Sequence, residues 1–364
     1  MQVMRSPLNL LLLCVPLAFV LEYLVPAPQS AVFVVAALAI VPLAGWLSRA
    51  TEELAVRLGT GLGGFLNATF GNATELIISF FALRAGQVEV VKATLLGSII
   101  GNLLLVMGFA AFLGGLRYPL LSFDVERAKG RASLLLIAII GFVVPAVFDF
   151  NERARVALTD LQSRDADAGL SLGVALILLG IYGATLVFAF GRQAEPIANE
   201  VEMEEAGTSW RPALAVAVLL LATVAIAFMS ELLVGALGSF TAALSLPTSF
   251  VGLVIIPIVG NAAEHASAVI FALKAEMELA VGIALGSALQ IALLVAPVLV
   301  LLSWAIGQPM DLVLGPLELI ALVGAVFIAS SVARDGEMHW LEGLMLLAVY
   351  AILALAFFFT SSGG

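Results

Sequence analysis

The feature that most constrains this chain is a succession of long apolar segments, separated by short connections that hold most of its charged residues. A helix needs roughly 20 mainly apolar residues to cross the hydrocarbon core of a bilayer. Of the 364 residues, 62% are hydrophobic and only 12% are charged. A water-soluble globule carries about 25% charged residues, so the sequence predicts an all-α integral membrane protein.

We expect about eleven transmembrane helices. The first apolar segment is also long enough for a signal peptide, but no small-residue cleavage site follows it, so it is kept as a span. The helix boundaries are less certain than the number of helices. The expected helices cover residues 8–25, 31–48, 60–83, 91–115, 132–150, 170–190, 212–238, 247–273, 279–303, 312–332 and 340–360.

The distribution of lysine and arginine predicts the orientation, because cytoplasmic connections are enriched in both residues. With the N-terminus inside, 11 of the 16 basic residues lie on the inner side, and the N-terminus is therefore predicted to be cytoplasmic. The inner residues are Arg5, Arg49, Arg57, Arg117, Arg127, Lys129, Arg131, Arg192, Arg211, Lys274 and Arg334; the outer ones are Arg84, Lys92, Arg153, Arg155 and Arg164.

The connection 191–211 is the main linker and separates two halves of similar length. Two interpretations stay open for it: a solvated charged loop, or a segment that senses or concentrates cations. Its acidic residues are Glu195, Glu200, Glu202, Glu204 and Glu205.

The formal net charge of −10 argues against nucleic acid or anionic lipid as the main partner, and the apolar composition predicts the lipid bilayer as the surroundings of the chain. The single cysteine, Cys14, lies in an apolar segment, so no disulfide forms within the chain and redox chemistry has no support. The sequence leaves a homo-oligomer open. No cofactor is predicted.

An internal repeat decides the architecture. Gly71-Asn72-Ala73-Thr74-Glu75 matches Gly260-Asn261-Ala262-Ala263-Glu264 at an offset of 189 residues, and Leu96-Gly97-Ser98 matches Leu285-Gly286-Ser287 at the same offset. Upstream, the segment from Thr51-Glu52 to Leu58-Gly59 resembles the one from Ser230-Glu231 to Leu237-Gly238. Two anchors at one offset indicate duplication.

Each copy would hold five helices, and an odd number places the two copies in the membrane with opposite orientation. Inverted repeats of this kind are typical of secondary transporters, whose substrate site lies near the midplane. The expected organisation is an N-terminal helix over 1–30, a first repeat over 31–190, a cytoplasmic acidic linker over 191–211 and a second repeat over 212–364.

The paired motifs carry the predicted site. Glu75 and Glu264 lie well inside apolar helices, where an unpartnered carboxylate costs several kcal/mol, so a functional role is favoured over a protonated structural acid. Asn72 and Asn261 stand three residues before them and share their helical faces. Pro257 would bend the second motif helix or free backbone carbonyls, and glycines from Gly59 to Gly64 loosen the approach to the first.

The next helix of each copy adds further oxygen donors. Together with two carboxylates they form a flexible, oxygen-rich set that suits Ca²⁺ better than Mg²⁺ or zinc. His265 is either a packed polar residue or a proton relay to Glu264. The added donors are Ser98 and Asn102 in the first copy and Ser287 and Gln290 in the second.

At these residues the chain resembles the CAX family of cation/proton exchangers, within the calcium/cation antiporters. The resemblance rests on GNATELI at 71–77 and GNAAEHASAVIFALKA at 260–275. It implies Ca²⁺ extrusion driven by protons, with cation and proton binding at Glu75 and Glu264. It also implies support from Asn72, Asn261, Ser98, Asn102, Ser287 and Gln290.

The expected activity is therefore exchange of Ca²⁺, or another divalent cation, for H⁺ by alternating access, and no enzymatic reaction. A sodium-coupled exchanger is the main alternative; a cation channel is less favoured, and an intramembrane metalloprotease lacks the motif that it would need. Short connections suggest a prokaryotic cell membrane.

Overall fold

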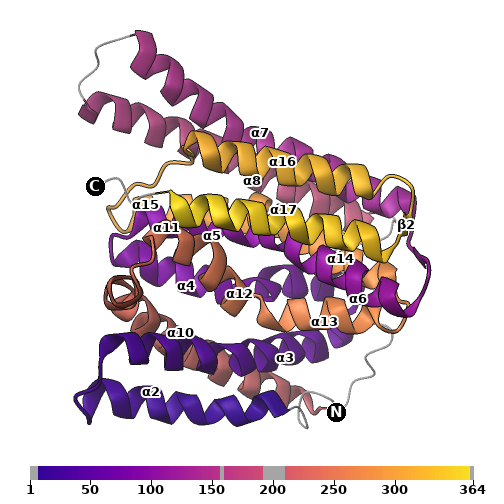
Figure 1. Ribbon diagram of the computed structural model, residues 1–364, viewed down its shortest axis with the longest axis horizontal. Helices are drawn as coiled ribbons and strands as arrows, with labels where there is room; N and C mark the ends of the chain where they lie inside the picture. The colour runs from indigo at the N-terminus through magenta and orange to yellow at the C-terminus, as the bar shows by residue number, and fades with distance from the viewer. Residues whose placement is uncertain (1–6, 156–159, 192–209, 361–364) are drawn as a thin grey trace. The chain divides into compact units, whose positions relative to one another are not determined.

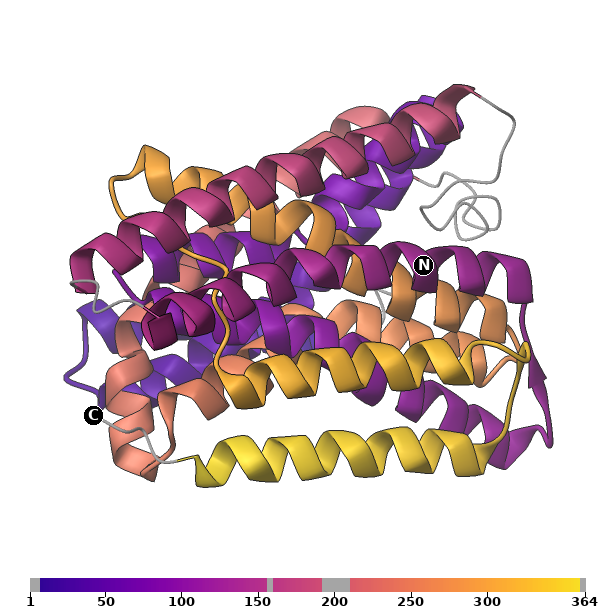
Figure 2. The same ribbon diagram turned by 90° about the horizontal axis from the view of Figure 1, so that it is seen from above.

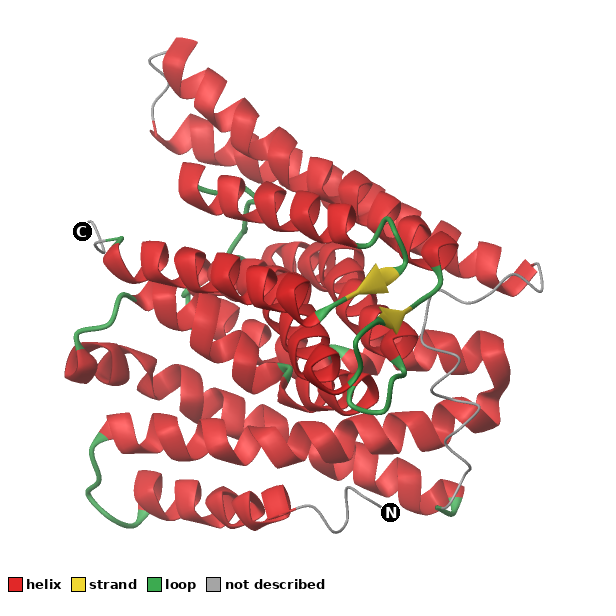
Figure 3. Ribbon diagram, turned by 45° about the vertical axis from the view of Figure 1, so that its right-hand side comes forward, coloured by secondary structure: helices red, strands yellow, loops and turns green. Residues whose placement is uncertain are grey.

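The computed structural model describes residues 7–155, 160–191 and 210–360, and nearly all regular structure within them is helical (Figure 3). Figure 1 shows the order of the elements. They are η1 (Pro7–Leu13), α2 (Cys14–Tyr23), α3 (Gln29–Gly71), α4 (Ala73–Arg84), α5 (Val88–Ile100), η2 (Gly101–Val106), α6 (Met107–Arg117), β1 (Leu121–Ser122), α7 (Val125–Arg155), α8 (Asp160–Gly191), α10 (Pro212–Leu244), α11 (Thr248–Phe250), η3 (Val251–Ile255), α12 (Ile256–Gly260), α13 (Ala262–Ala272), α14 (Met277–Gln290), η4 (Ile291–Val295), α15 (Ala296–Ala305), α16 (Pro316–Val332), β2 (Glu337–Met338) and α17 (Trp340–Phe359).

Seven helices in the described part of the chain are long and apolar enough to cross a membrane, or eight if one strongly bent pair counts as a span. The protein is therefore a multi-pass membrane protein. The spans cover Gln29–Gly59, Val88–Arg117, Val125–Glu152, Asp165–Phe188, Pro212–Leu244, Met277–Ala305 and Trp340–Phe359, and the bent pair is Thr248–Gly260 with Ala262–Ala272.

The remaining expected helices exist but are shorter or interrupted. The first and tenth apolar segments form the helices Leu8–Tyr23 and Pro316–Val332, both shorter than a full span. The third, expected over 60–83, is divided between the end of α3 and α4. The number of eleven spans stays a prediction.

The acidic linker falls on 192–209, outside the described residues.

The second span is longer than expected, since it continues from residue 48 to Gly59. Charged residues in this last part pair along the helix instead of ending it: Arg49 contacts Glu52 and Glu53, and Arg57 contacts Glu53. Spacings of three and four residues place such pairs side by side. At Gly59 the backbone has φ 75° and ψ 177°, a left-handed conformation that glycine adopts readily, and the helix turns there.

The chain divides into two compact units, and each unit draws on both halves of the sequence. Unit 1 consists of Met1–Thr94, Arg192–Ser267 and Ala354–Gly364. Within it α2, α3 and α10 pack side by side (Figure 1). Phe33 of α3 stacks on Phe240 of α10 with ring centroids 4.0 Å apart. Fully buried alanines on both helices allow this close approach.

Unit 2 consists of Leu95–Gly191 and Ala268–Leu353, and α14 packs against α6 and α7 inside it. A Cβ atom on Gly343 would lie only 2.7 Å from the carbonyl oxygen of Gly108, so α17 and α6 touch backbone to backbone. Figure 2 shows α16 and α17 joined by the connection that carries β2. This strand pairs antiparallel with β1, with Leu121 opposite Met338 and Ser122 opposite Glu337.

Candidate ion-binding site

The first motif interrupts its helix at the asparagine. α3 ends at Gly71 and α4 begins at Ala73, and between them Asn72 has the non-helical angles φ −100° and ψ 22°. Its carbonyl still accepts a hydrogen bond from the Leu76 N–H at 3.1 Å, so Asn72 starts the new helix. Glu75 therefore lies in the first turn of α4, near a helix N-terminus, where a negative charge is favoured.

The second motif is interrupted at the equivalent residue. Asn261 lies between α12 and α13 with φ −96° and ψ 10°, and its carbonyl accepts the His265 N–H at 2.9 Å. The helices on either side are bent by 63°. Glu264 thus also lies in the first turn of a new helix. The same local geometry appears 189 residues after the first.

Proline explains the bend of the second motif. Pro257 lacks a backbone N–H and cannot continue the ordinary ladder, and the π-helix η3 directly precedes α12, which contains it. The bend expected from Pro257 is confirmed. The Pro257 carbonyl itself accepts hydrogen bonds from the Asn261 backbone N–H at 2.9 Å and from Nδ2 at 3.0 Å. The carbonyls that proline would free belong to the preceding turn, and their release stays a prediction.

Glu75 is held by residues of the second motif. It is 2% exposed. A Cβ atom on Gly260 would lie 3.3 Å from Glu75 Oε1, so the carboxyl group rests against the glycine backbone. The side-chain amide of Asn261 donates a hydrogen bond to the same carboxyl group. Oε1 itself has no hydrogen-bond partner among the described residues.

Glu264 interacts electrostatically with Glu75, so unit 1 brings the two acids together. The two differ in burial, since Glu264 is partly exposed. Asn72 is 1% exposed and lies in the same unit. His265, the residue after Glu264, is partly exposed, and its role as a proton relay stays a prediction.

The other predicted donors lie in unit 2. Ser98, Asn102 and Ser287 are buried and Gln290 is partly exposed. Spacings of four and three residues put each pair on one face of its helix. Neither polar atom of the Asn102 side chain has a hydrogen-bond partner among the described residues. A buried amide in this state is suited to bind a ligand.

Both of these helices change to π-helical geometry next to their predicted donors. Asn102 lies in η2, and Gln290 is the last residue before η4. π-helical turns are rare and frequently occur at functional sites. In the described part of the chain, three or more His, Cys, Asp or Glu side chains never gather as a metal site would require. A cation near the two glutamates would therefore need amide, hydroxyl, carbonyl or water oxygens as well.

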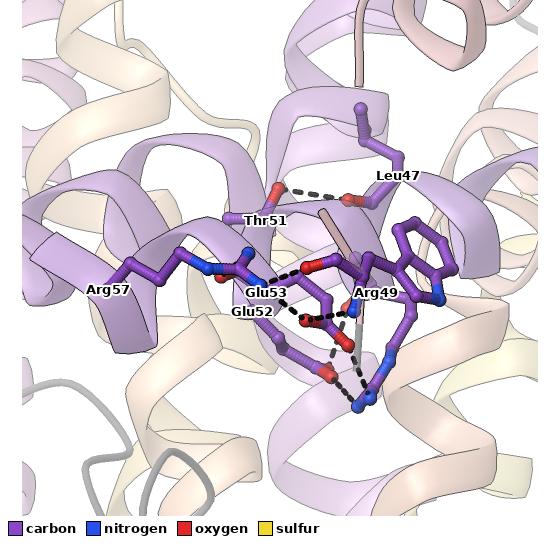
Figure 4. A network of polar contacts seen from close by, with 8 residues as sticks. Leu47, Arg49, Thr51, Glu52, Glu53 and Arg57 are labelled. Carbon is purple, nitrogen blue, oxygen red and sulfur yellow. Dashed lines mark hydrogen bonds and ion pairs between the residues drawn. The ribbon is translucent and has the colours of Figure 1, made fainter. Parts of the chain in front are cut away.

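Sequence reasoning missed a second polar cluster, at the end of the first long span (Figure 4). Its centre is Glu53, which is 2% exposed. Arg49 Nη2 lies 2.7 Å from Glu53 Oε1, and Arg57 Nη2 lies 3.8 Å from Oε2. Arg49 also reaches Glu52 at 3.3 Å. The four-residue spacing of Arg49, Glu53 and Arg57 was the signal that could have revealed this cluster.

The cluster binds the backbone of Trp210, just before α10. The Trp210 N–H donates to Glu53 Oε2 at 3.2 Å, and Arg57 donates to the Trp210 carbonyl. The rings of Trp46 and Trp210 stack at 5.8 Å. Trp46 Nε1 also donates to Asn9 Oδ1 at 3.0 Å, so the N-terminal helical segment, to which the sequence assigned no functional residue, is connected as well.

Comparison with known proteins identifies the family. The model of the family described as "Sodium/calcium exchanger protein" matches residues 29–191 and 214–359. A Ca²⁺/H⁺ antiporter of Synechocystis is 48% identical over 97% of this chain and 96% of its own length. The Ca²⁺/H⁺ antiporter ChaA of Bacillus subtilis is 42% identical over 94% and 96%.

A solved structure has the same fold. The native YfkE structure superposes with a TM-score of 0.82 at 40% identity, covering 96% of this chain and 99% of that one. The family match and the two relatives each cover far more than half of the sequence. The chain therefore belongs to the sodium/calcium exchanger protein family, in the CAX branch that its motifs predicted.

Proposed function

We propose that this protein exchanges Ca²⁺ for H⁺ across a membrane by alternating access, and that Glu75 and Glu264 bind either the cation or protons. The observation that carries the proposal is the contact between the motifs, in which Gly260 and Asn261 hold Glu75 and Glu264 interacts with it. The names of the relatives support the choice of ions.

Charge balance explains why the exchange would be obligatory. Two carboxylates with one Ca²⁺ are neutral, and so are two carboxylic acids. The empty, ionised pair carries a charge of −2, and burying it in a low-dielectric interior without a partner is strongly unfavourable. The pair therefore crosses the occluded state only when it is loaded. Two protons per Ca²⁺ are the simplest stoichiometry, and a third proton on His265 would make exchange electrogenic.

The wider arrangement is also part of the proposal. Two inverted five-helix repeats, preceded by one helix, would carry the motifs, with the N-terminus in the cytoplasm. The helix breaks at Asn72 and Asn261 support the duplication, because the same backbone geometry recurs at the offset seen in the sequence. Ser98, Asn102, Ser287 and Gln290 remain predicted oxygen donors, and the oligomeric state is left open.

The test is ⁴⁵Ca²⁺ uptake into proteoliposomes under an imposed pH gradient without sodium. We expect uptake that follows the gradient in the native protein and is lost in both Glu75→Gln and Glu264→Gln. Uptake that ignores the pH gradient but responds to a sodium gradient would contradict proton coupling and assign the protein to sodium-coupled exchange.

A further inference from the structure

Several buried or half-buried hydroxyl groups on the helices of this protein bind a backbone carbonyl of the preceding turn. Thr51 donates to the Leu47 carbonyl at 2.9 Å, Thr223 to Leu219 at 2.7 Å, and Ser303 to Val300 at 2.6 Å. This local bond satisfies a hydroxyl that has no water to bind. A helix hydroxyl that does not form it must point elsewhere.

Ser79 is such an exception on the helix of Glu75. Its side chain is 1% exposed, and its Oγ has no hydrogen-bond partner among the described residues. Ser230 of α10, which packs against α4, behaves in the same way. Of the two, only Ser79 has its position relative to Glu75 fixed by a shared helix.

An unsatisfied buried hydroxyl is unfavourable, and alanine would fill the same space with a better helix propensity. The second motif has alanine there: Ala268, one turn after Glu264, is fully buried. Four residues after the acid, the first motif therefore has serine and the second has alanine; the second motif has a serine three residues after its acid, Ser267, but that residue is partly exposed. The buried, unpartnered hydroxyl one turn after the acid is thus a feature of the Glu75 side of the site.

Helix geometry places Ser79 within reach of an ion at Glu75. Residues four apart have Cβ atoms about 5 to 6 Å apart, and the Cα–Cβ bond of Ser79 tilts toward the turn that carries Glu75. Two oxygens that share one Ca²⁺ lie at most about 5 Å apart, because each is about 2.3 to 2.6 Å from the ion. We infer that the Ser79 hydroxyl is an additional oxygen ligand of the cation that Glu75 binds. The inference rests on the proposed function.

The first experiment measures equilibrium binding of ⁴⁵Ca²⁺ to the purified full-length protein in detergent. We expect Ser79→Ala to raise the apparent Kd about tenfold, the loss of one oxygen ligand. The matched control is Thr223→Val, which removes a hydroxyl already bonded to a carbonyl, and it should bind like the native protein. An unchanged Kd in Ser79→Ala would overturn the inference.

The second experiment distinguishes direct contact from packing. A thiol is a soft ligand. The Ser79→Cys variant should therefore bind Cd²⁺ more tightly than the native protein, which has a hydroxyl at this position. In a Cys14→Ser background we expect Cd²⁺ to displace ⁴⁵Ca²⁺ from Ser79→Cys at a concentration at least about tenfold lower than from the control Thr223→Cys. Equal Cd²⁺ sensitivity of the two cysteine variants would mean that residue 79 does not touch the ion. This variant also covers the case in which Ser79→Ala does not fold.

These measurements use no ion gradient, so they do not depend on the counter-ion. Failure of the native protein to bind ⁴⁵Ca²⁺ would overturn the proposed function, and the inference about Ser79 with it. Native binding with unaltered variants would overturn only the role of Ser79.

Discussion

Glu75 and Glu264 hold the same position in the two motifs, yet Glu75 is 2% exposed whereas Glu264 is partly open. The contacts of Glu75 come from the second motif, through Gly260 and Asn261. A duplicated sequence has thus produced two acids in different environments. Equivalent motif residues are therefore not interchangeable, and the buried acid should tolerate substitution less.

The copies also differ in the helix before each motif. In α3 the cluster of Arg49, Glu53 and Arg57 is charged. The matching positions of α10, found by aligning Thr51-Glu52 with Ser230-Glu231, hold Phe228, Leu232 and Ala236. Only the first copy can therefore bind the Trp210 backbone in this way. The second copy is apolar at the same three positions.

The largest effect is expected from shortening the two acids. Glu75→Asp should lower Ca²⁺ exchange by at least about 100-fold, because its carboxyl group would leave the fixed contacts with Gly260 and Asn261. Glu264→Asp should lower it by at most about tenfold, since a partly exposed side chain can adjust. Initial rates of ⁴⁵Ca²⁺ exchange in proteoliposomes measure both. Equal losses would show that the difference in burial has no functional meaning.

The charged cluster of the first copy should matter next, for stability. Glu53→Gln is expected to lower the free energy of unfolding by about 2 to 3 kcal/mol, because it removes the acid that pairs with Arg57 and leaves Arg49 with Glu52 as its one acid partner among the described residues. Glu52→Gln is the matched control and should cost less than about 1 kcal/mol, since Glu52 is more exposed and contacts only Arg49 among the described arginines. Denaturation midpoints in detergent would decide, and a loss as large in Glu52→Gln would be inconsistent with a central role for Glu53.

A smaller effect on transport is expected from Gly260→Ala. The new methyl group would lie 3.3 Å from Glu75 Oε1, closer than ordinary contact, and should displace the carboxyl group. We expect about a tenfold lower exchange rate, equivalent to about 1.4 kcal/mol. In Gly235→Ala, where a Cβ atom meets nothing within 4 Å, the rate should stay native. A native rate in Gly260→Ala would argue against a close contact with Glu75.

The smallest effect concerns the ends of the two motif helices. Gly86 and Ala275 occupy equivalent left-handed positions, with φ 73° and 67°. The backbone hydrogen bonds that end the two helices also correspond. The Gln87 N–H donates to the Ala82 carbonyl, and the Glu276 N–H donates to the Phe271 carbonyl. Alanine is strained there by about 1 kcal/mol, so Ala275→Gly should stabilise the protein by that amount and Gly86→Ala should destabilise it. Opposite shifts in the thermal midpoint are the expected result, and shifts of the same sign would contradict it.

The class of protein could be predicted from the sequence, because apolar segments of spanning length follow from bilayer thickness. The repeat of the two motifs could also be read directly. The helix interruptions at Asn72 and Asn261 were not predicted, because each asparagine was expected to share a helical face with its glutamate. The predicted end of the first long span was wrong: the prediction placed it at residue 48, and the span continues for eleven more residues to Gly59. The charged segment after residue 48 was expected to lie outside the helix. Pairing between Arg49, Glu52, Glu53 and Arg57 keeps it helical.

The packing of the site could not be predicted in the same way. Contact of Glu75 with Gly260 depends on how helices from different halves pack, and no local pattern encodes that distance. The difference in burial between the two acids is likewise a property of the tertiary structure. Ser79 was overlooked because a serine in a helix is unremarkable until its hydroxyl is found to lack the usual carbonyl partner.

The most direct test asks whether the Glu75–Glu264 pair can cross the membrane empty. Proteoliposomes loaded with ⁴⁵Ca²⁺ would be diluted into an alkaline medium that contains neither Ca²⁺ nor sodium, with the membrane potential clamped. We predict almost no efflux, rapid efflux when unlabelled Ca²⁺ is added, and rapid efflux when the medium is acidified. Continued efflux into the alkaline, Ca²⁺-free medium would contradict obligatory exchange, because the unloaded, ionised pair would then be returning on its own.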